Sequence, residues 1–411
     1  MDTLKVRDAK DVEEVVRAAV ASEQPLEVIG HGSKRAIGHP MATNALLDVS
    51  ALNAVSSYEP NELIITVQAG APLADVQSLI DAKNQQFAFE PMDTSVLLGT
   101  AGAGTIGGMI GAGLAGPRRI KAGGIRDHLL GAHAVSGFGD SFKTGGRVVK
   151  NVTGYDLCKL LTGSWGTLAV MSEVTLKVMP KPEAERTLLL RGLDDVTANK
   201  AMTAALGSPF DVSGAAHLPG SALRSGGGAL AGLAAGQPVT LVRLEGISAS
   251  AAHRAASLSQ TLSSFGAVDS LADDASAAIW SALRDVVPFA ANGALGAWPV
   301  WRIVCPPASG GALGQALSRA TGGDVIYDWG GGLIWAAVPP GADAQATLVR
   351  GQVEAIGGHA TLIRATEDVR RAVDVFQPQA AGLAALGERV RASFDPRSVL
   401  NRGRMMRGGA A

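Results

Sequence analysis

Apolar and polar positions along the first 180 residues predict a series of short strands and helices. Over residues 11–23 the apolar positions recur at three- and four-residue intervals, the spacing of one buried helix face. Apolar runs at 26–29, 45–49, 63–67, 129–135 and 170–178 predict strands, and residues 72–83 predict a helix that begins with proline. Pro180 and Pro182 then predict a domain boundary.

The rest of the chain shows two sets of alternating strand-like and helix-like segments. The first set has strands at 187–190 and 239–244 and helices at 197–206 and 249–265. The second has strands at 300–305, 332–338 and 360–364 and helices at 314–319 and 342–356. These sets predict a second α+β domain with an internal pseudo-repeat. Residues 221–236, rich in glycine, alanine and serine, predict a mobile loop, and 380–394 a last helix.

Length and composition place these elements in a globular protein of more than one domain. The 411 residues exceed one ordinary core, and 47% of them are hydrophobic against 18% charged. A formal net charge of −1 provides no basic field, so neither nucleic acid nor an anionic lipid surface is an expected partner. The chain has no apolar run long enough to span a membrane and its first residues are charged, so we expect a cytoplasmic location.

Cysteine and histidine are too sparse for a metal centre. Cys158 and Cys305 cannot supply the four thiolates that an iron–sulfur cluster usually takes, nor a zinc knuckle. The seven histidines show no HxH or HExxH spacing. The sequence therefore predicts no metal site in this chain.

Residues 102–107, GAGTIG, match the dinucleotide fingerprint G-x-G-x-x-G, and Asp127 follows at about the expected spacing of ~20 residues. The context argues against an NAD-binding Rossmann unit. Asp127 precedes the strand predicted at 129–135 instead of ending a second strand. Residues 112–124 contain Pro117 and four glycines, which cannot form the crossover helix of that fold. NAD binding is therefore the weaker interpretation.

A second glycine signal, VIGHGSK at residues 28–34, lies where a predicted strand opens into a loop. Successive backbone N–H groups in such a loop can surround a pyrophosphate, and the glycines permit close approach and positive φ. The hydroxyl of Ser33 and the ammonium of Lys34 add donors. Taken alone, a strand followed by this loop is more often only a turn.

Three blocks in order resemble the FAD-binding domain of the vanillyl-alcohol-oxidase superfamily, also called the PCMH type. They are the loop at 28–34, the stretch TIGGMIGAGLAGPRRIKAGGIRDHLLGAHAV and the stretch KNVTGYDLCKLLTGSWGTLAVMSEVTLKV. The ending FDPRSVLNRGRM is similar to that of the D-lactate and glycolate dehydrogenase branch. Within this branch the chain resembles the FAD-binding E subunits of bacterial glycolate oxidases. The resemblance is thin between residues 185 and 380.

The resemblance implies an α+β protein with a two-lobed PCMH-type FAD-binding domain at 1–182 and a ferredoxin-like α+β cap at 183–380. A C-terminal helix and return segment would occupy 381–411. Some relatives tether FAD through a histidine directly after Gly-x-Gly, where this chain has Ser33, so the resemblance implies non-covalent FAD. The residues it assigns to FAD are Gly30, His31, Gly32, Ser33 and Lys34 at the pyrophosphate, Pro91, Thr94, Thr105, Gly107 and Gly108 along the dinucleotide, Pro117 and Arg118 near the ring system, and Gly166, Thr167, Val170 and Asn401.

The signature HxxGDGNxH, with which relatives bind metal and oxidise D-2-hydroxy acids, is missing from the second domain. His359 is expected at an exposed strand start, and His217 is no better candidate. Arg118, Arg302 and Arg364 could bind a substrate carboxylate, although arginines on loops more often lie on the surface. No catalytic residue is therefore predicted.

Three hypotheses follow from the absence of this signature. The chain is a flavin subunit of a glycolate dehydrogenase complex, relaying electrons while a homologous flavin subunit abstracts the hydride and a separate iron–sulfur subunit carries electrons onward. Alternatively, it is a self-sufficient FAD-dependent oxidase of hydroxy acids or alcohols, or a scaffold without flavin chemistry. In a complex, any contact with the inner membrane would be made by partner subunits.

Five of the six tryptophans fall between residues 280 and 335, in a segment with few charges. Such a density of aromatic side chains is found in domain cores and also in partner interfaces and pocket walls. Both interpretations are kept, with the core as the more ordinary one. The six are Trp165, Trp280, Trp298, Trp301, Trp329 and Trp335.

Overall fold

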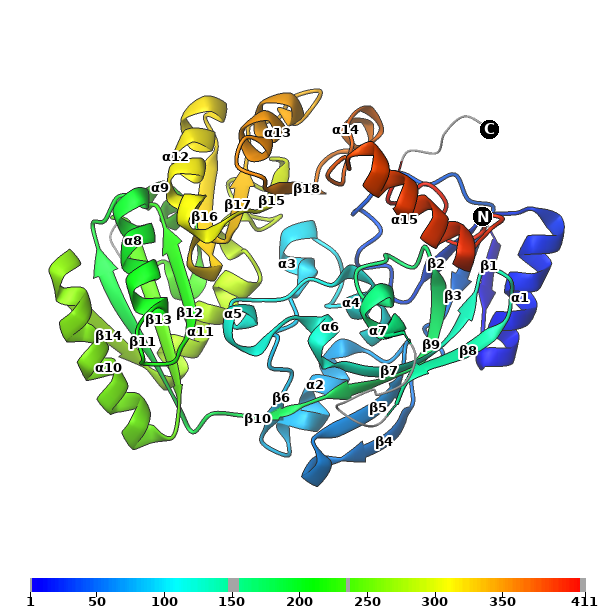
Figure 1. Cartoon of the computed structure of the whole chain (residues 1–411), viewed down its shortest axis with the longest axis horizontal. Coiled ribbons are helices and arrows are strands. Elements are labelled where there is room, and N and C mark those ends of the chain that lie inside the picture. The colour runs from blue at the N-terminus through cyan, green and yellow to red at the C-terminus, as the bar shows by residue number, and fades with distance from the viewer. Residues whose placement is uncertain (1, 147–154, 234–236, 407–411) are drawn as a thin grey trace.

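The computed structural model describes residues 2–146, 155–233 and 237–406. It has two halves that lie side by side, an N-terminal half that the C-terminal segment rejoins and a second half built on one large sheet (Figure 1). The third block of the family resemblance, residues 150–178, begins with residues 150–154, which lie outside the described residues. No helix in the described segments is long and apolar enough to cross a membrane.

The N-terminal half contains two principal sheets, which correspond to the two predicted lobes. Three parallel strands form the first, in the order β1–β3–β2, with β1 at Asp2–Lys5, β3 at Ala45–Asp48 and β2 at Leu26–Ile29. Five antiparallel strands form the second, in the order β4–β5–β9–β7–β8. Their bounds are Val55–Glu59, Ile64–Gln68, Ala169–Lys177, Leu129–Ser136 and Ser141–Gly145.

Short helices surround and connect these sheets. The helix predicted at 11–23 is α1, Ala9–Ser22, which begins where Asp8 accepts hydrogen bonds from two backbone N–H groups and buries Val12 and Val16. The other helices and the small strand pair of this half are α2 Leu73–Asp81, α3 Thr94–Leu98, α4 Ile106–Ala112, α5 Arg119–Ala122, α6 Ile125–His128, α7 Leu157–Leu161, β6 Gln85–Gln86 and β10 Met179–Pro180.

The second half is an eight-stranded antiparallel sheet in the order β14–β11–β13–β12–β16–β17–β15–β18. Its first four strands and two helices follow the β-α-β-β-α-β order of a ferredoxin-like unit, and the next six elements repeat it. The two units meet edge to edge at β12 and β16, where His217 pairs with Tyr327. The prediction of an α+β cap with an internal repeat is therefore confirmed.

The first unit consists of β11 Ala184–Arg191, α8 Asp195–Leu206, β12 Val212–Leu218, β13 Val239–Gly246, α10 Ser248–Leu262 and β14 Val268–Ala272. The second consists of β15 Val300–Val304, α12 Gly310–Thr321, β16 Asp324–Asp328, β17 Leu333–Ala337, α13 Ala346–Glu354 and β18 His359–Arg364. Helix α11, Asp273–Arg284, connects the units and was not predicted, because its apolar positions fall between recognisable strand signals.

The loop predicted at 221–236 is only partly correct. Residues Gly220–Ser225 form helix α9, and a short 3₁₀ turn follows at Gly228–Leu230. Ala222, Leu223, Leu230 and Leu233 are buried in the core between the sheet and the N-terminal half. Because these apolar side chains have a core to enter, the segment folds despite its glycine content; residues 234–236 lie outside the described residues.

Tryptophans fill the core of the second half, as the more ordinary interpretation predicted. Trp280 and Trp301 are almost completely buried, and Trp329 and Trp335 are buried as well. Trp298 is partly buried against the same core.

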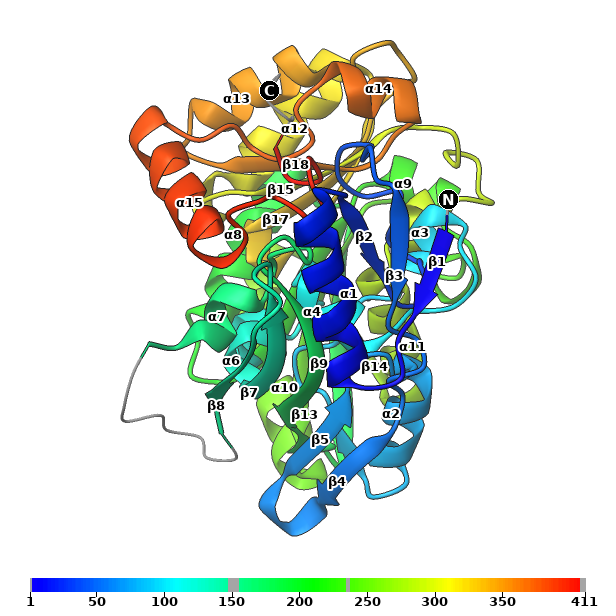
Figure 2. The ribbon, with the colours of Figure 1, turned by 90° about the vertical axis from the view of Figure 1, so that its right-hand side faces the viewer.

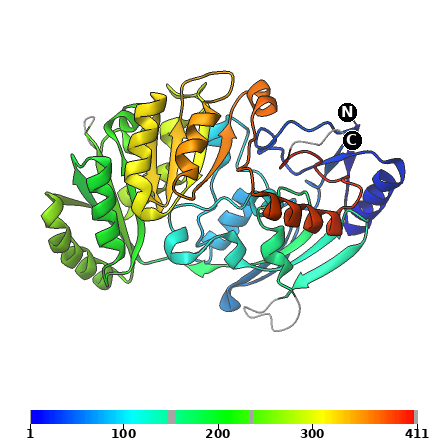
Figure 3. The ribbon, with the colours of Figure 1, turned by 45° about the horizontal axis from the view of Figure 1, so that its top comes forward.

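The end of the chain returns to the N-terminal half (Figures 2 and 3). After α14, Glu367–Ala372, helix α15 spans Ala381–Phe394, and Leu400 then forms a parallel bridge with Leu26 of β2. The boundaries at 182 and 380 stay predictions. Strand β10 at Met179–Pro180 pairs with β6, and β11 begins at Ala184.

Candidate cofactor site

The loop of residues 30–34 follows β2 and leaves its backbone donors free. None of the backbone N–H groups from Gly30 to Lys34 donates a hydrogen bond to another described residue. Gly32 has φ +68°, which favours glycine, and a Cβ on Gly30 would lie 2.5 Å from Oγ1 of Thr105. Free N–H groups in a loop of this shape are suited to surround an anion.

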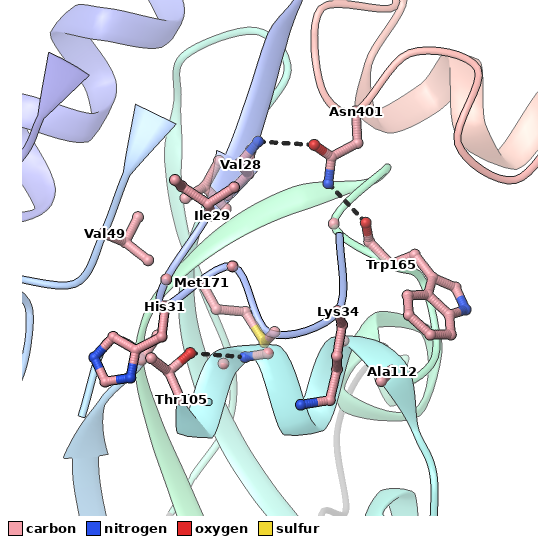
Figure 4. Close-up of a pocket in the computed structure, with 18 of the residues that line it drawn as sticks. Val28, Ile29, His31, Lys34, Val49, Thr105, Ala112, Trp165, Met171 and Asn401 are labelled. Carbon is pink, nitrogen blue, oxygen red and sulfur yellow. Dashed lines mark hydrogen bonds between the residues drawn. The ribbon is translucent and has the colours of Figure 1, made fainter. Parts of the chain in front are cut away.

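A cavity with about 710 Å³ of space, part of it open to solvent, borders this loop. Most of its lining comes from four parts of the chain (Figure 4): strand β2 with the loop, helix α4 with Thr105 before it, the segment from Trp165 to Met171, and the C-terminal return; Val49 and Ala69 complete it. Of the predicted site residues, the structure brings these to the cavity: Gly30, His31, Gly32, Ser33, Lys34, Thr105, Gly107, Gly108, Gly166, Val170 and Asn401.

Positive charge is concentrated at the loop side of the cavity. Lys34 is buried, with Nζ 3.3 Å from Oγ of Ser33 and 3.2 Å from the carbonyl oxygen of Ala103. Burial and, to a smaller extent, the nearby Arg404 lower the pKa of Lys34, Asp93 opposes the change, and the resulting pKa is about 8. Arg404 donates to the carbonyl of Lys34 and stacks on the Trp165 ring. Burial lowers its pKa to about 10.

Asn401 ties the C-terminal return to the cavity. Its side-chain oxygen accepts from the N–H of Val28 at 2.7 Å, and its side-chain nitrogen donates to the carbonyl of Trp165 at 2.7 Å (Figure 4). Its own N–H donates to the carbonyl of Leu26. A Cβ on Gly166, which has φ +70°, would lie 2.7 Å from the Asn401 amide nitrogen. One side chain thus aligns β2, the Gly166 turn and the chain end.

Five predicted residues lie away from this cavity: Pro91, Thr94, Pro117, Arg118 and Thr167. Thr94 is completely buried and its Oγ1 has no hydrogen-bond partner among the described residues. Thr167 donates to the carbonyl of Ser164 and approaches Sδ of Met405 at 3.6 Å.

Arg118 forms ion pairs between the two halves. Its Nη2 lies 2.7 Å from Oε1 of Glu245, and its backbone N–H donates to Glu90. The guanidinium of Arg118 is therefore already occupied by a carboxylate from the second half.

Other cavity residues carried no signal that sequence reasoning could use. Val28, Ile29, Val49, Ala69 and Met171 are ordinary apolar residues of strands and turns. Trp165 and Arg404 face the cavity through contacts between distant parts of the chain. The predicted ending FDPRSVLNRGRM contains Arg404, but nothing in its pattern singles out this arginine.

The remaining candidates for substrate chemistry have structural roles or stand apart. Arg364, the last residue of β18, is partly buried and donates to the backbone carbonyls of Leu97, Phe289, Leu295 and Trp298, so its guanidinium is already occupied. His359 is the first residue of β18 and is exposed, as predicted, while His217 is fully buried. Within residues 2–146, 155–233 and 237–406, no three His, Cys, Asp or Glu side chains are placed to hold a metal ion.

Comparison with known families and proteins matches both halves of the chain. Residues 3–145 match the FAD binding domain family, and residues 199–318 match the C-terminal domain family of FAD linked oxidases. Glycolate oxidase subunit GlcE of Escherichia coli (strain K12) is 30% identical over 396 residues, which covers 95% of each chain. Glycolate oxidase subunit GlcD of Bacillus subtilis (strain 168) is 30% identical over 184 residues, 44% of this chain and 38% of that protein.

Solved structures of low sequence identity share the fold. A p-cresol methylhydroxylase with substrate bound superposes with a TM-score of 0.69 at 14% identity, covering 98% of this chain and 88% of that one. An alkyldihydroxyacetonephosphate synthase superposes with a TM-score of 0.68 at 16% identity, covering 97% and 76%.

Proposed function

The chain belongs to the PCMH-type family of FAD-linked oxidases, and on this basis we propose that it is the FAD-binding subunit of a complex that oxidises glycolate to glyoxylate. Its cofactor is FAD, and it is an FAD-dependent oxidoreductase that acts on hydroxy acids. The membership in a complex, the electron path and the residues assigned to FAD are the proposed parts.

The observation that carries the proposal is the row of free N–H groups from Gly30 to Lys34 on the cavity. We place the FAD pyrophosphate there, because free amides and the Lys34 ammonium replace the hydration that two phosphate charges lose on binding. The Gly166 turn and Asn401 would close the other side. Ser33 occupies the position of a tethering histidine, which supports non-covalent binding. When bound, FAD supplies a two-electron acceptor for the C–H bond of the hydroxy acid.

Two features of the chain support a role in electron relay rather than in hydride abstraction or iron–sulfur chemistry. The metal signature of hydroxy-acid-oxidising relatives is missing from the sequence, which supports an electron-relay role beside a homologous flavin subunit. Both cysteines are buried, and burial raises the pKa of each thiol to about 11, which disfavours the thiolate that an iron–sulfur cluster needs. A separate iron–sulfur subunit is therefore the proposed electron acceptor.

The assembly proposal is tested with the purified chain, alone and together with the two proposed partner subunits. Flavin absorption that persists when glycolate is added anaerobically to the chain alone, and bleaches once the partners are present, supports the relay role. Bleaching in the chain alone would instead favour the self-sufficient oxidase. A chain purified under native conditions without flavin would contradict both.

The loop assignment is tested by Gly32→Asp. We expect this variant to lose at least about nine-tenths of its bound FAD, since a side chain is strained at φ +68° and a carboxylate would repel the pyrophosphate. Gly322→Asp is the matched control, because Gly322 lies far from the cavity and has φ +70°, and a Cβ added to it would have no atom within 4 Å. Flavin-to-protein absorbance ratios measure the effect. Normal FAD content in Gly32→Asp would contradict the assignment.

A further inference from the structure

Two arginines from different halves of the chain lie against one tryptophan ring. Arg119 of α5 lies 4.4 Å from the centroid of Trp329, and Arg302 of β15 lies 5.1 Å from it. The indole N–H of Trp329 donates to the carbonyl of Gly116 at 3.0 Å, which fixes the ring against the N-terminal half. Arg119 therefore comes from one half, and Arg302 and Trp329 from the other.

The register of the sheet points Arg302 toward the N-terminal half. Its neighbours Trp301 and Ile303 belong to the core under helices α12 and α13, so Arg302 lies on the opposite face. Asp328 is placed on this face by the same alternation, because Tyr327 enters the helix-side core and Ile326 the interface core. The two side chains thus share the sheet face that looks toward the FAD-binding half.

Neither guanidinium forms an ion pair with a described carboxylate, although Asp328 lies near enough to oppose the lowering of the Arg302 pKa by burial. In the part of the chain that the structure describes, the guanidinium groups of Arg302 and Arg119 make no hydrogen bond and no ion pair, and both lie against the Trp329 ring. Glu90 and Glu245, two acidic groups of the same interface, are paired with Arg118 and Arg243. Two cations near one ring repel each other. Burial and Arg119 lower the pKa of Arg302, Asp328 opposes this change, and the resulting pKa is about 10.

Asp328 adds a carboxyl group whose ionisation is disfavoured in this setting. It is 7% exposed, and its carboxylate accepts only the N–H of Trp329 among the described residues. Burial raises its pKa to about 7, the Trp329 N–H and the charges of Arg243 and Arg302 oppose that rise, and Glu90 adds to it. A neutral carboxyl can donate a hydrogen bond to an anion, and in that form Asp328 neutralises none of the positive charge beside it.

We propose that Arg302, Arg119 and Asp328 form a binding site for a small carboxylate between the two halves of the chain. A carboxylate placed between the guanidinium groups would remove their mutual repulsion and supply the acceptor that each lacks. Arg119 is exposed, so the site opens to solvent on its side. The site itself is inferred from the arginines, but the choice of probes rests on the proposed function. Glycolate is the proposed substrate, and oxalate is a two-carbon analogue that the flavin cannot oxidise.

The test is calorimetric titration of the full-length, FAD-loaded chain with oxalate at constant ionic strength. Arg302→Met keeps an apolar chain over Trp329 and removes the charge, and we expect oxalate affinity to fall at least about tenfold. Arg319→Met is the matched control, because Arg319 is an exposed arginine on α12 of the same half. The control should bind oxalate like the wild type.

Folding of the variants is checked by bound FAD and by the melting temperature. If Arg302→Met does not fold, Arg119→Met replaces it, since its exposed side chain can be shortened without opening a cavity. We expect it to weaken oxalate binding severalfold. No oxalate binding by the wild type, or unchanged affinity in the folded arginine variants, would overturn the site.

A second titration, with glycolate, distinguishes whether the bound anion is a substrate or a non-reacting effector. Binding that depends on Arg302 supports the site in either case. Bleaching of the flavin by glycolate identifies the anion as a substrate of this subunit, and binding without bleaching identifies a non-reacting effector. Loss of complex activity with intact oxalate binding would count against the proposed function and not against this site.

Discussion

At the residue scale, three cations and no acidic side chain of the described residues line the cavity, and one of the cations, Arg35, is paired with Glu27. Lys34 and Arg404 both lie at the loop of residues 30–34, and both have their pKa lowered by burial, to about 8 and about 10. A buried cation that loses hydration is stabilised when a phosphate replaces the water. The free amides of the loop and these two cations would therefore all stabilise the negative charge of a bound pyrophosphate.

This arrangement predicts that FAD affinity depends on pH through Lys34. In the free protein Lys34 is charged below about pH 8. A bound pyrophosphate favours the charged form, so the pKa in the complex lies above 8. FAD affinity should therefore be constant below pH 8 and fall, by up to about tenfold per pH unit, as the pH rises above it.

Quenching of flavin fluorescence at pH 7 and pH 9.5 measures this effect. Lys34→Met is the comparison, because any titration of the flavin itself affects both proteins. The variant should bind FAD about 10- to 100-fold more weakly at pH 7 and change less with pH. Parallel pH profiles in the two proteins would exclude Lys34 as the titrating group.

At the element scale, the large sheet depends on a short junction. Strands β12 and β16 share one pair, His217 with Tyr327, where the two ferredoxin-like units meet. Tyr327 donates to Oδ2 of Asp195 at 2.7 Å, and Nε2 of His217 lies 3.3 Å from Oδ1 of the same carboxylate. The Asp195 carboxylate of helix α8 thus contacts both residues of the junction, and Asn199 of the same helix accepts from the N–H of Gly311 in the second unit. Burial and this carboxylate raise the pKa of Tyr327, so the phenol stays protonated and donates.

Tyr327→Phe should weaken this junction. The change removes one buried hydrogen bond to a charged group, and we expect the free energy of unfolding to fall by about 1.5–3 kcal/mol. FAD content should stay normal, because neither Tyr327 nor its partners line the cavity. Urea unfolding of the second half, followed by tryptophan fluorescence, measures the change.

The control is Tyr58→Phe, which removes a hydrogen bond of the same length, 2.7 Å, to the neutral side chain of Gln85. Tyr58 is only partly buried, so its loss should cost less than about 1 kcal/mol. Equal effects of the two substitutions would show that the carboxylate of Asp195 does not strengthen the junction.

At the scale of the whole molecule, alternating charges join the two halves. Glu90 accepts from Arg243 at 2.8 and 3.0 Å, and Arg118 pairs with Glu245 at 2.7 Å and with Glu90 at 3.4 Å. Although burial alone would raise the pKa of Glu90, Arg243 and Arg118 lower it. Stabilisation by Glu90 is therefore present above the usual carboxyl pKa and lost only as the pH falls through its lowered value.

Glu90→Ala should weaken the contact between the two halves and lower the stability of the protein. It leaves Arg243 buried with one partner fewer, and breaking such a pair typically costs about 3–5 kcal/mol. We expect faster cleavage between the halves in limited proteolysis and a lower melting temperature. Glu388→Ala is the control, since its pair with Arg391 is half exposed and should contribute less than about 1 kcal/mol. Equal stability of the two variants would contradict the role of Glu90.

The sequence by itself determined those features that depend on neighbouring residues. Helical and strand periodicity indicated α1 and many of the strands, but it missed β1, β4, β6, β8 and β10 in the N-terminal half and β12, β14 and β16 in the second. Two sets of alternating segments indicated the repeated α+β unit. The loop at 28–34 could be identified because strand, glycine and donor residues are adjacent. Three blocks in order indicated FAD through their resemblance to the PCMH-type family, whereas the glycine spacing at 102–107 taken alone did not.

Only the tertiary structure decided which distant residues meet. Asn401 reaches Val28 and Trp165, Arg118 is occupied by Glu245, and Arg119 and Arg302 share the ring of Trp329. No local pattern distinguishes these arginines from surface arginines, because their environment is made by packing of the two halves. Periodicity reports which face of an element is buried, but the partner of a buried charge depends on how whole sheets are placed against each other.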